Sequence, residues 1–204
     1  MTATSYARKR RVARSQLSRV SEVITFESDL GWIAASWRED LLKRLTFGHA
    51  TPQAAVAHLK TDDSMVVSAH NRKVFMERIC AFATGKRSDD FLDIQLDIEE
   101  MTPFQQAVIE RCRRISEGET LTYGELAEAV GHPRAARAVG SVMANNRFPL
   151  IVPCHRVLAA GGAIGGFTAP DGINMKRRML AAEQDDSACI LNIPHKKSRL
   201  QNET

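Results

Sequence analysis

The sequence predicts an α+β chain with two parts, one of short strands with two helices and one that is mainly helical. Strand-like runs separated by turn residues fill residues 20–46, and helix-capping patterns recur after residue 100. A length of 204 residues with 44% hydrophobic residues is enough for a real core. We therefore expect an N-terminal α/β domain over residues 20–100 and a C-terminal domain over residues 101–185.

Charge and cysteine content narrow the class of protein. The chain has 28 Lys and Arg against 24 Asp and Glu, a formal net charge of +4, which permits a polyanionic partner without requiring one. No long apolar run or secretion signal is present, and the cysteines have no metal-binding spacing. We expect free thiols, no metal and no membrane segment, in a reducing, intracellular compartment such as the cytoplasm. The cysteines are at positions 80, 112, 154 and 189.

The two ends of the chain have no periodic apolar face. Residues 1–19 contain several arginines and no acidic residue, which predicts a basic flexible arm that either contacts nucleic acid or is simply solvated. Residues 186–204 mix both signs of charge and are predicted to be a loosely held tail.

The N-terminal part should contain a sheet and two helices. Runs at 23–26, 32–37 and 41–47 predict an antiparallel meander. A proline at the first helical position predicts a helix over 52–59, a longer helix follows over about 71–84, and alternation over 91–98 predicts a strand with one buried face. Some residues here could bind metal by type but lack ligand spacing, so we interpret them as packing or surface residues. They are Cys80, His49, His58 and His70.

The C-terminal part should begin with helices. Thr102 and Gln105 form a capping box ahead of a helix ending near residue 118, and Thr122 with Glu125 forms another ahead of a helix stopped by Gly131. A third helix is expected from residue 133 to about 146. Because a short turn containing glycine joins the last two, they predict a helix-turn-helix.

The outer face of the third predicted helix is small and cationic. Arg134, Arg137, Ala138 and Ser141 lie at helical spacing on it. For a lone helix the two arginines would be ordinary solvated charges, whereas the second helix of a helix-turn-helix is usually presented to a DNA groove. The pattern therefore favours DNA contact.

The candidate reaction centre is Cys154. Three apolar residues at 150–152 predict a short buried segment, and Pro153 then breaks regular structure, so that Cys154 is offered at a turn. A thiol reacts as thiolate, and a neighbouring group such as His155 or Arg156 is expected to lower its pKa from about 8.5. The alternative is a buried cysteine that packs as a small hydrophobe.

A glycine-rich loop over 161–168 follows, and its glycine spacing is too irregular for a dinucleotide-binding site. A last helix is expected over about 174–184. Lys176, Met179 and Glu183 share one side of this helix with Leu180. A carboxylate at the margin of an apolar stripe needs a partner. For Glu183 either a surface salt bridge or a hydrogen bond to a buried histidine would serve.

The string from Pro153 to Val157 after an apolar run resembles the reactive-cysteine motif of the O6-alkylguanine-DNA alkyltransferases, also called methylated-DNA-protein-cysteine methyltransferases. Residues 118–127 and 137–140 are similar to the family's sequence ahead of that motif, and the likeness is strongest over 102–183. It implies a ribonuclease-H-like N-terminal domain and a winged-helix-like C-terminal domain that carries the helix-turn-helix.

The resemblance also implies a role for each matched residue. Cys154 would accept the alkyl group, His155 would act as its base through a water, Glu183 would orient the histidine, Tyr123 would face the flipped guanine, and Asn146 would brace the turn. Arg137 would fill the gap left by the flipped base, on a DNA-binding face with Arg134, Ala138 and Ser141. The expected substrate pocket comprises Pro149, Val157, Phe167 and Thr168.

The implied activity is DNA repair by direct reversal. A monomer would bind double-stranded DNA with an alkylated base and transfer the alkyl group from O6-alkylguanine, or O4-alkylthymine, to its own cysteine once, without cofactor or metal. Phe167 replaces a tyrosine found in many relatives, and residues 169–174 look longer than in several of them, which affects the alkyl groups accepted.

The sequence pattern also has two rival interpretations. An alkyltransferase-like lesion-binding protein without chemistry would have replaced the cysteine, and Cys154 is present. A Cys-His hydrolase would need a turnover route and gives no reason for the helix-turn-helix.

Overall fold

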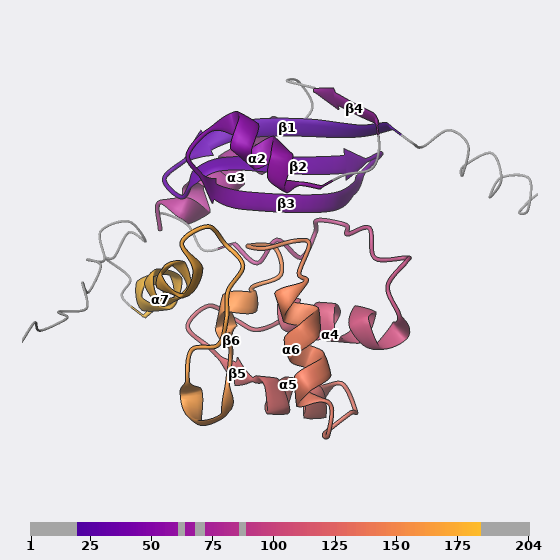
Figure 1. Cartoon of the computed structure of the whole chain (residues 1–204), viewed down its shortest axis with the longest axis vertical. Coiled ribbons are helices and arrows are strands. Elements are labelled where there is room, and N and C mark those ends of the chain that lie inside the picture. Colours follow the sequence, from indigo (N-terminus) through magenta and orange to yellow (C-terminus); the bar gives the residue numbers. More distant parts are fainter. Residues whose placement is uncertain (1–19, 61–63, 68–71, 86–88, 185–204) are drawn as a thin grey trace, which may run out of the picture.

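The computed structural model describes residues 20–60, 64–67, 72–85 and 89–184. The predicted arm, the predicted tail, His70 and Cys189 lie outside these ranges. A sheet with two helices forms one layer, and the remaining helices lie beside the edge of that sheet (Figure 1). The chain is thus mixed α and β, as the sequence predicts. No helix in the described ranges is long and apolar enough to cross a membrane.

The predicted meander is confirmed. The first three strands are β1 (Val20–Ser28), β2 (Gly31–Arg38) and β3 (Leu41–His49). Each pairs antiparallel with the next one along the chain. A further strand that the sequence analysis missed, β4 (Ser64–Val67), pairs parallel with β1, so the sheet order is β3-β2-β1-β4. The turn between β1 and β2 needs glycine, because Gly31 has a φ of +89° and an added Cβ would lie 3.0 Å from the His49 carbonyl oxygen.

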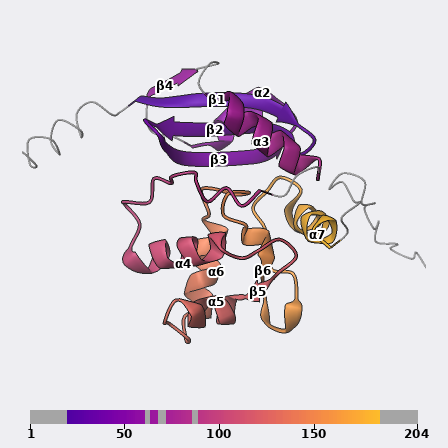
Figure 2. The same ribbon diagram turned by 180° about the vertical axis from the view of Figure 1, so that it is seen from behind.

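One helix covers each face of the sheet, as the two opposite views show (Figures 1 and 2). Helix α2 (Pro52–His58), capped by Thr51, packs over the face that carries Val23 and Ala34. Helix α3 (Lys73–Ala83) packs over the other face, which carries Ile24. This division follows from the strand period, since successive side chains point to opposite faces.

The predicted strand over 91–98 is wrong. Phe91 has a φ of +51°, and its carbonyl accepts a hydrogen bond from the Ile94 amide, so the segment starts as a turn. Only a single bridge, between Leu42 and Leu96, joins it to β3. The carbonyls of Phe91 and Ile94 instead accept hydrogen bonds from the buried Arg113 guanidinium, at 2.8 Å each. The apolar residues of this segment alternate with polar ones because they contact the core, although the segment forms no regular strand.

Both predicted capping boxes are present. They begin α4 (Pro103–Arg113) and α5 (Tyr123–Ala129). Helix α4 ends earlier than expected, and α6 (Ala136–Ala144) starts later than expected, because residues 132–135 form a turn in which the Ala135 amide bonds to His132. Arg134 therefore lies in the turn before α6, not on the helix as predicted. Helices α5 and α6 pack against each other.

After α6 the chain runs through two short turns to the last helix. A short turn of 3-10 helix, η1 (Cys154–Arg156), leads into β6 (Val157–Leu158), which pairs parallel with β5 (Leu121–Thr122). A second such turn, η2 (Ala160–Gly162), precedes α7 (Gly172–Ala182). The main cluster of buried apolar residues is continuous from the sheet to this segment.

The outer edge of β3 is covered by residues 95–97 and by Arg147 of the C-terminal part. Leu42 exchanges backbone hydrogen bonds with Gln95 and Asp97, and the Leu45 amide donates to the Arg147 carbonyl at 2.8 Å. An exposed sheet edge offers unpaired backbone groups, so this pairing both protects the edge and fixes the C-terminal part against the sheet.

Arg113→Met should lower the free energy of unfolding by about 3 kcal/mol, because the carbonyls of Phe91 and Ile94 lose the hydrogen bonds that the buried guanidinium donates. Urea denaturation would measure the change. Arg114→Met, at the exposed neighbouring position, is the control and should change stability by less than about 0.5 kcal/mol. Equal effects of the two substitutions would show that Arg113 does not hold the 91–94 turn.

Candidate active site

Cys154 follows a buried segment of the chain. Leu150, Ile151 and Val152 are at most 4% exposed, which confirms the predicted buried segment. The Val152 amide bonds to the Phe148 carbonyl, and the Cys154 amide bonds back to the Val152 carbonyl at 2.7 Å. The chain therefore turns tightly at Pro153 and presents the cysteine at the first position of η1.

The next two residues share one carboxylate. His155 Nε2 lies 2.7 Å from Glu183 Oε1, and Arg156 donates to the same carboxylate from Nε and Nη2 at 2.9 to 3.1 Å. Arg156 Nη1 also donates to the Ile115 carbonyl at 2.6 Å. The Glu183 side chain is only 6% exposed, so the carboxylate has both a histidine and a buried salt-bridge partner, where the sequence left these as alternatives.

The protonation states of this pair follow from its surroundings. Burial raises the pKa of Glu183, but the hydrogen bonds and charges of His155 and Arg156 outweigh it and bring the pKa to about 2. The pKa of His155 is lowered, chiefly by burial and also by the charges of Arg156 and Lys176, although Glu183 acts in the opposite direction. An ionised carboxylate can only accept, so His155 donates from Nε2, and its Nδ1 keeps a free lone pair that can take a proton.

The expectation that His155 or Arg156 lowers the Cys154 pKa is wrong. Burial raises the pKa of the Cys154 thiol, and the opposing contributions come from a hydrogen bond with Asn146, from the Lys176 charge and from the Cys154 backbone. Arg156 instead faces Glu183. Cys154 therefore rests as a thiol and needs a base to become a nucleophile.

Lys176 is a site residue that the sequence analysis missed. It is fully buried on α7, and its Nζ donates to the Val157 carbonyl at 2.6 Å and to the Cys154 carbonyl at 3.5 Å. These bonds hold both ends of the turn that carries the cysteine. Its position among the apolar residues of the last predicted helix was the available signal, because a lysine there must bury its charge near a partner.

Asn146 joins the turn from the end of α6. Its Nδ2 donates to the Val152 carbonyl at 3.0 Å and its Oδ1 accepts from the Phe148 amide at 2.9 Å. The side chain thus ties the segment before the cysteine in place, as the expected brace would.

Tyr123 lies close to the reactive turn. Its pKa is raised by burial and then by the charge that Cys154 can carry, so the phenol remains a proton donor at neutral pH. A Cβ added to Gly165 would lie 2.7 Å from the Tyr123 hydroxyl. Glycine at that position therefore lets the loop backbone approach the phenol.

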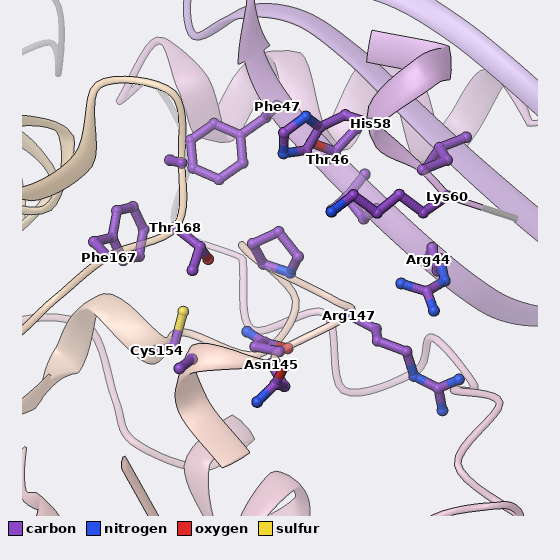
Figure 3. Close-up of a pocket in the computed structure, with 16 residues that line it drawn as sticks. Arg44, Thr46, Phe47, His58, Lys60, Asn145, Arg147, Cys154, Phe167 and Thr168 are labelled. Atoms are coloured by element: carbon purple, nitrogen blue, oxygen red, sulfur yellow. The ribbon is translucent and has the colours of Figure 1, made fainter. Parts of the chain in front are cut away.

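Cys154 lines a cavity of about 430 Å³ that lies between the two parts of the chain (Figure 3). Pro149, Phe167 and Thr168 line it with Cys154, as expected for a substrate pocket. Val157 does not line it, because its side chain is buried in the core. The opposite wall comes from β3 and from the end of α2, and was not anticipated from the sequence. It consists of Arg44, Leu45, Thr46, Phe47, His58, Leu59 and Lys60.

The segment after Phe167 rests on the sheet. The rings of Phe47 and Phe167 meet edge to face at 6.4 Å, and a Cβ on Gly48 would lie 3.4 Å from the Pro170 ring. The loop that looked longer than in relatives therefore packs on β3.

Helix α6 presents the expected small, cationic face. Arg137, Ala138 and Ser141 are exposed, while Val139 and Met143 pack inward. Arg134 is exposed in the preceding turn. Within the described ranges neither arginine forms an ion pair, so both charges are available to a polyanion.

Known proteins resemble this chain in sequence and in structure. Residues 103–185 match the family described as 6-O-methylguanine DNA methyltransferase, DNA binding domain. The methylated-DNA–protein-cysteine methyltransferase of Mycobacterium tuberculosis is 32% identical over 83% of this chain and 96% of its own, and that of Methanosarcina acetivorans is 35% identical over 78% and 95%. The crystal structure of Mycobacterium tuberculosis OGT in complex with DNA matches with a TM-score of 0.69 at 30% identity, covering 83% of this chain and 97% of that one.

The shifted pKa values of His155 and Glu183 predict how the free energy of unfolding depends on pH. The folded-state pKa of His155 lies below its ordinary value of 6.5, so the unfolded chain takes up this proton first and the free energy of unfolding should fall as the pH drops below 6.5. Glu183 should add a further loss, on the order of 3 kcal/mol, as the pH falls from 4.5 towards its folded pKa of about 2.

Glu183→Gln should remove that second loss, and at pH 7 it should cost on the order of 3 kcal/mol because Arg156 loses its buried counter-charge. Urea denaturation at a series of pH values would measure both effects. Glu128→Gln, at an exposed position, should keep the parent's pH dependence. A Glu183→Gln curve parallel to the parent's would show that this carboxylate does not titrate as the geometry requires.

Proposed function

The chain belongs to the methylated-DNA–protein-cysteine methyltransferases, and from this membership we propose which of its residues carry out the transfer. It is a suicide enzyme of DNA repair, which removes an alkyl group from DNA by moving it to a cysteine of its own. Its relatives and its family are named for this activity.

We propose Cys154 as the acceptor. The observation that carries this assignment is that Cys154 lines the cavity while the next residue, His155, is held by a buried carboxylate. A water would pass the thiol proton to His155 Nδ1, and the ionised Glu183 would stabilise the imidazolium. The sulfur then forms a bond to the alkyl carbon as the bond from that carbon to guanine O6 breaks.

The leaving base takes the electron pair of the broken bond and needs a proton. Tyr123, whose phenol stays protonated, is proposed to donate it, and the proton on His155 can restore the phenol. The product is a thioether, which is too stable to hydrolyse. Each molecule should therefore act once, on O6-alkylguanine and, as the family resemblance suggests, on O4-alkylthymine.

We propose that α5, the following turn and α6 form a helix-turn-helix whose exposed α6 face meets double-stranded DNA. The alkyl group of the lesion lies inside the base stack, so the base must be extruded to reach a buried thiol. The small side chains Ala138 and Ser141 would permit close approach, and Arg137 would fill the vacated place. The sheet order, with β4 parallel to β1, supports the ribonuclease-H-like shape for the N-terminal part.

A non-catalytic lesion-binding role is the weaker alternative. It would require a residue other than cysteine at the turn, whereas Cys154 is present and reaches the cavity.

Intact-protein mass after incubation with excess oligonucleotide containing one O6-methylguanine should rise by one methyl group and then stop, with the modification mapped to Cys154. Cys154→Ala should show no gain while still binding the lesion, and Cys112→Ala, which changes a buried cysteine outside the cavity, should still be methylated. Steady turnover beyond one group per protein, or methylation of Cys154→Ala, would falsify the assignment.

Arg137→Ala should slow repair of duplex DNA by about tenfold or more relative to repair of a single-stranded oligonucleotide, because an extruded base costs a few kcal/mol to reach from paired duplex and less from an unpaired strand. Single-turnover rates on both substrates would measure this.

Arg134→Ala is the matched control, since Arg134 is also exposed but lies before α6. A phosphate contact there would weaken binding to all DNA alike and reduce the salt slope by about one unit. If Arg137→Ala behaved in that same way on both substrates, Arg137 would be a general electrostatic residue and not the finger.

A further inference from the structure

Resting on the proposed function, we infer that the ion pair between Asp171 and Arg178 positions the loop that carries Phe167 and Thr168 for alkyl transfer. Neither member of the pair is among the residues that line the cavity. Both therefore act through the loop and touch no reacting atom. They are positioning residues, which set where this wall of the cavity lies relative to the Cys154 thiol.

Residues 169–172 form the turn that ends this loop. The Gly172 amide donates to the Ala169 carbonyl at 2.7 Å, and Asp171 has a φ of −89° and a ψ of 7°, the geometry of the third residue of a type I turn. Proline is favoured at the second position of such a turn, where Pro170 stands. Local sequence therefore determines the turn, which presents Pro170 and Asp171 to different neighbours.

The two side chains of the turn attach it to the sheet and to the last helix. Pro170 packs beside β3, where a Cβ added to Gly48 would lie 3.4 Å from its ring. Asp171 precedes α7 but caps no backbone amide of that helix, although an aspartate at this position commonly does. Its Oδ2 instead accepts a hydrogen bond from Arg178 Nη2 at 2.9 Å.

Arg178 is the more buried member of the pair. Its side chain is 13% exposed, against 34% for Asp171. Its Nη2 also donates to the sulfur of Met175, which is packed in the core. The guanidinium therefore has a fixed direction on α7, and the carboxylate of the turn is held by it.

Helix α7 connects this pair to the groups that react. Lys176 Nζ donates to two carbonyls of the reactive turn, and Glu183, just after the helix, lies 2.7 Å from His155. Because an α-helix holds its residues at fixed spacing, Arg178 keeps a constant relation to both of these tethers. The pair thus places the loop in the same frame as the thiol and its proposed base.

The loop forms the part of the cavity beside the thiol. Phe167 and Thr168 line the cavity together with Cys154 (Figure 3), and Gly165 of the same loop approaches the Tyr123 hydroxyl. An extruded base placed between the thiol and the phenol would therefore contact this loop. Since a displacement of about 1 Å in a positioning group can lower a rate strongly, the attachment of the loop bears on the transfer step.

Asp171→Asn and Arg178→Gln should each lower the single-turnover rate of methyl transfer by about three- to fivefold, measured with a saturating duplex that contains O6-methylguanine. The effect is modest because a partly exposed ion pair contributes little. Asparagine suits the turn as well as aspartate does. Arg178→Lys keeps the charge and should stay within about twofold of the parent. The double variant should be no slower than either single variant, because the two residues act through one contact.

Arg177→Gln is the matched control. Arg177 is an exposed residue of the same helix that donates to Asn174, so its substitution removes the same charge without touching the loop, and the rate should equal the parent's. An equal loss in Arg177→Gln would mean that the charge of α7 acts on DNA in general, and the inference would be wrong.

Urea denaturation of each variant separates positioning from stability. Variants that are less stable but transfer at the parent's rate would show a purely structural ion pair and overturn the inference. A double variant slower than both single variants, by the product of their effects, would overturn it as well. Absence of methyl transfer in the parent would refute the proposed function together with the inference, whereas transfer by the parent with unaffected variants would refute the inference alone.

Discussion

The arrangement of the site depends on one buried carboxylate. Glu183, just beyond the last residue of α7, is shared by His155 and Arg156 of the reactive turn, and Arg156 also reaches the Ile115 carbonyl after α4. A buried ion that lost any of these partners would be left uncompensated, so the three segments must keep their relative positions. The Cys154 turn is thereby held between two helices, and Lys176 adds a second tether from α7.

For Cys154 as the proposed acceptor, this arrangement favours a resting thiol. Burial favours the thiol form of Cys154, and the imidazole beside it is neutral. The ionised Glu183 orients that imidazole and prepares it to accept a proton. A single-use protein gains from such a state, because a permanently ionised thiolate would be open to oxidation and to other alkylating agents.

The N-terminal part of the chain contributes to the site as well as to the core. The outer edge of β3 is paired with residues 95–97 and Arg147, and Phe47 packs against Phe167 of the active-site loop. One wall of the Cys154 cavity is therefore sheet, and its charges come from Arg44 and Lys60. Under the proposed function, the reacting residues and the surroundings of the alkyl group would come from different parts of the sequence.

The sequence by itself determined the features that depend on neighbouring residues: the meander, the two capping boxes, the buried run before Pro153 and the cysteine at a turn. These follow from periodicity, backbone restriction and local hydrogen bonds. The prediction of a strand over 91–98 was wrong because Arg113, which is distant in sequence, donates hydrogen bonds to carbonyls of that segment. Tertiary structure alone decided the pairing of Glu183 with Arg156, the raised pKa of Cys154, the role of Lys176 and the cationic wall, because burial and Coulomb interactions depend on distances in space between residues that are far apart in sequence.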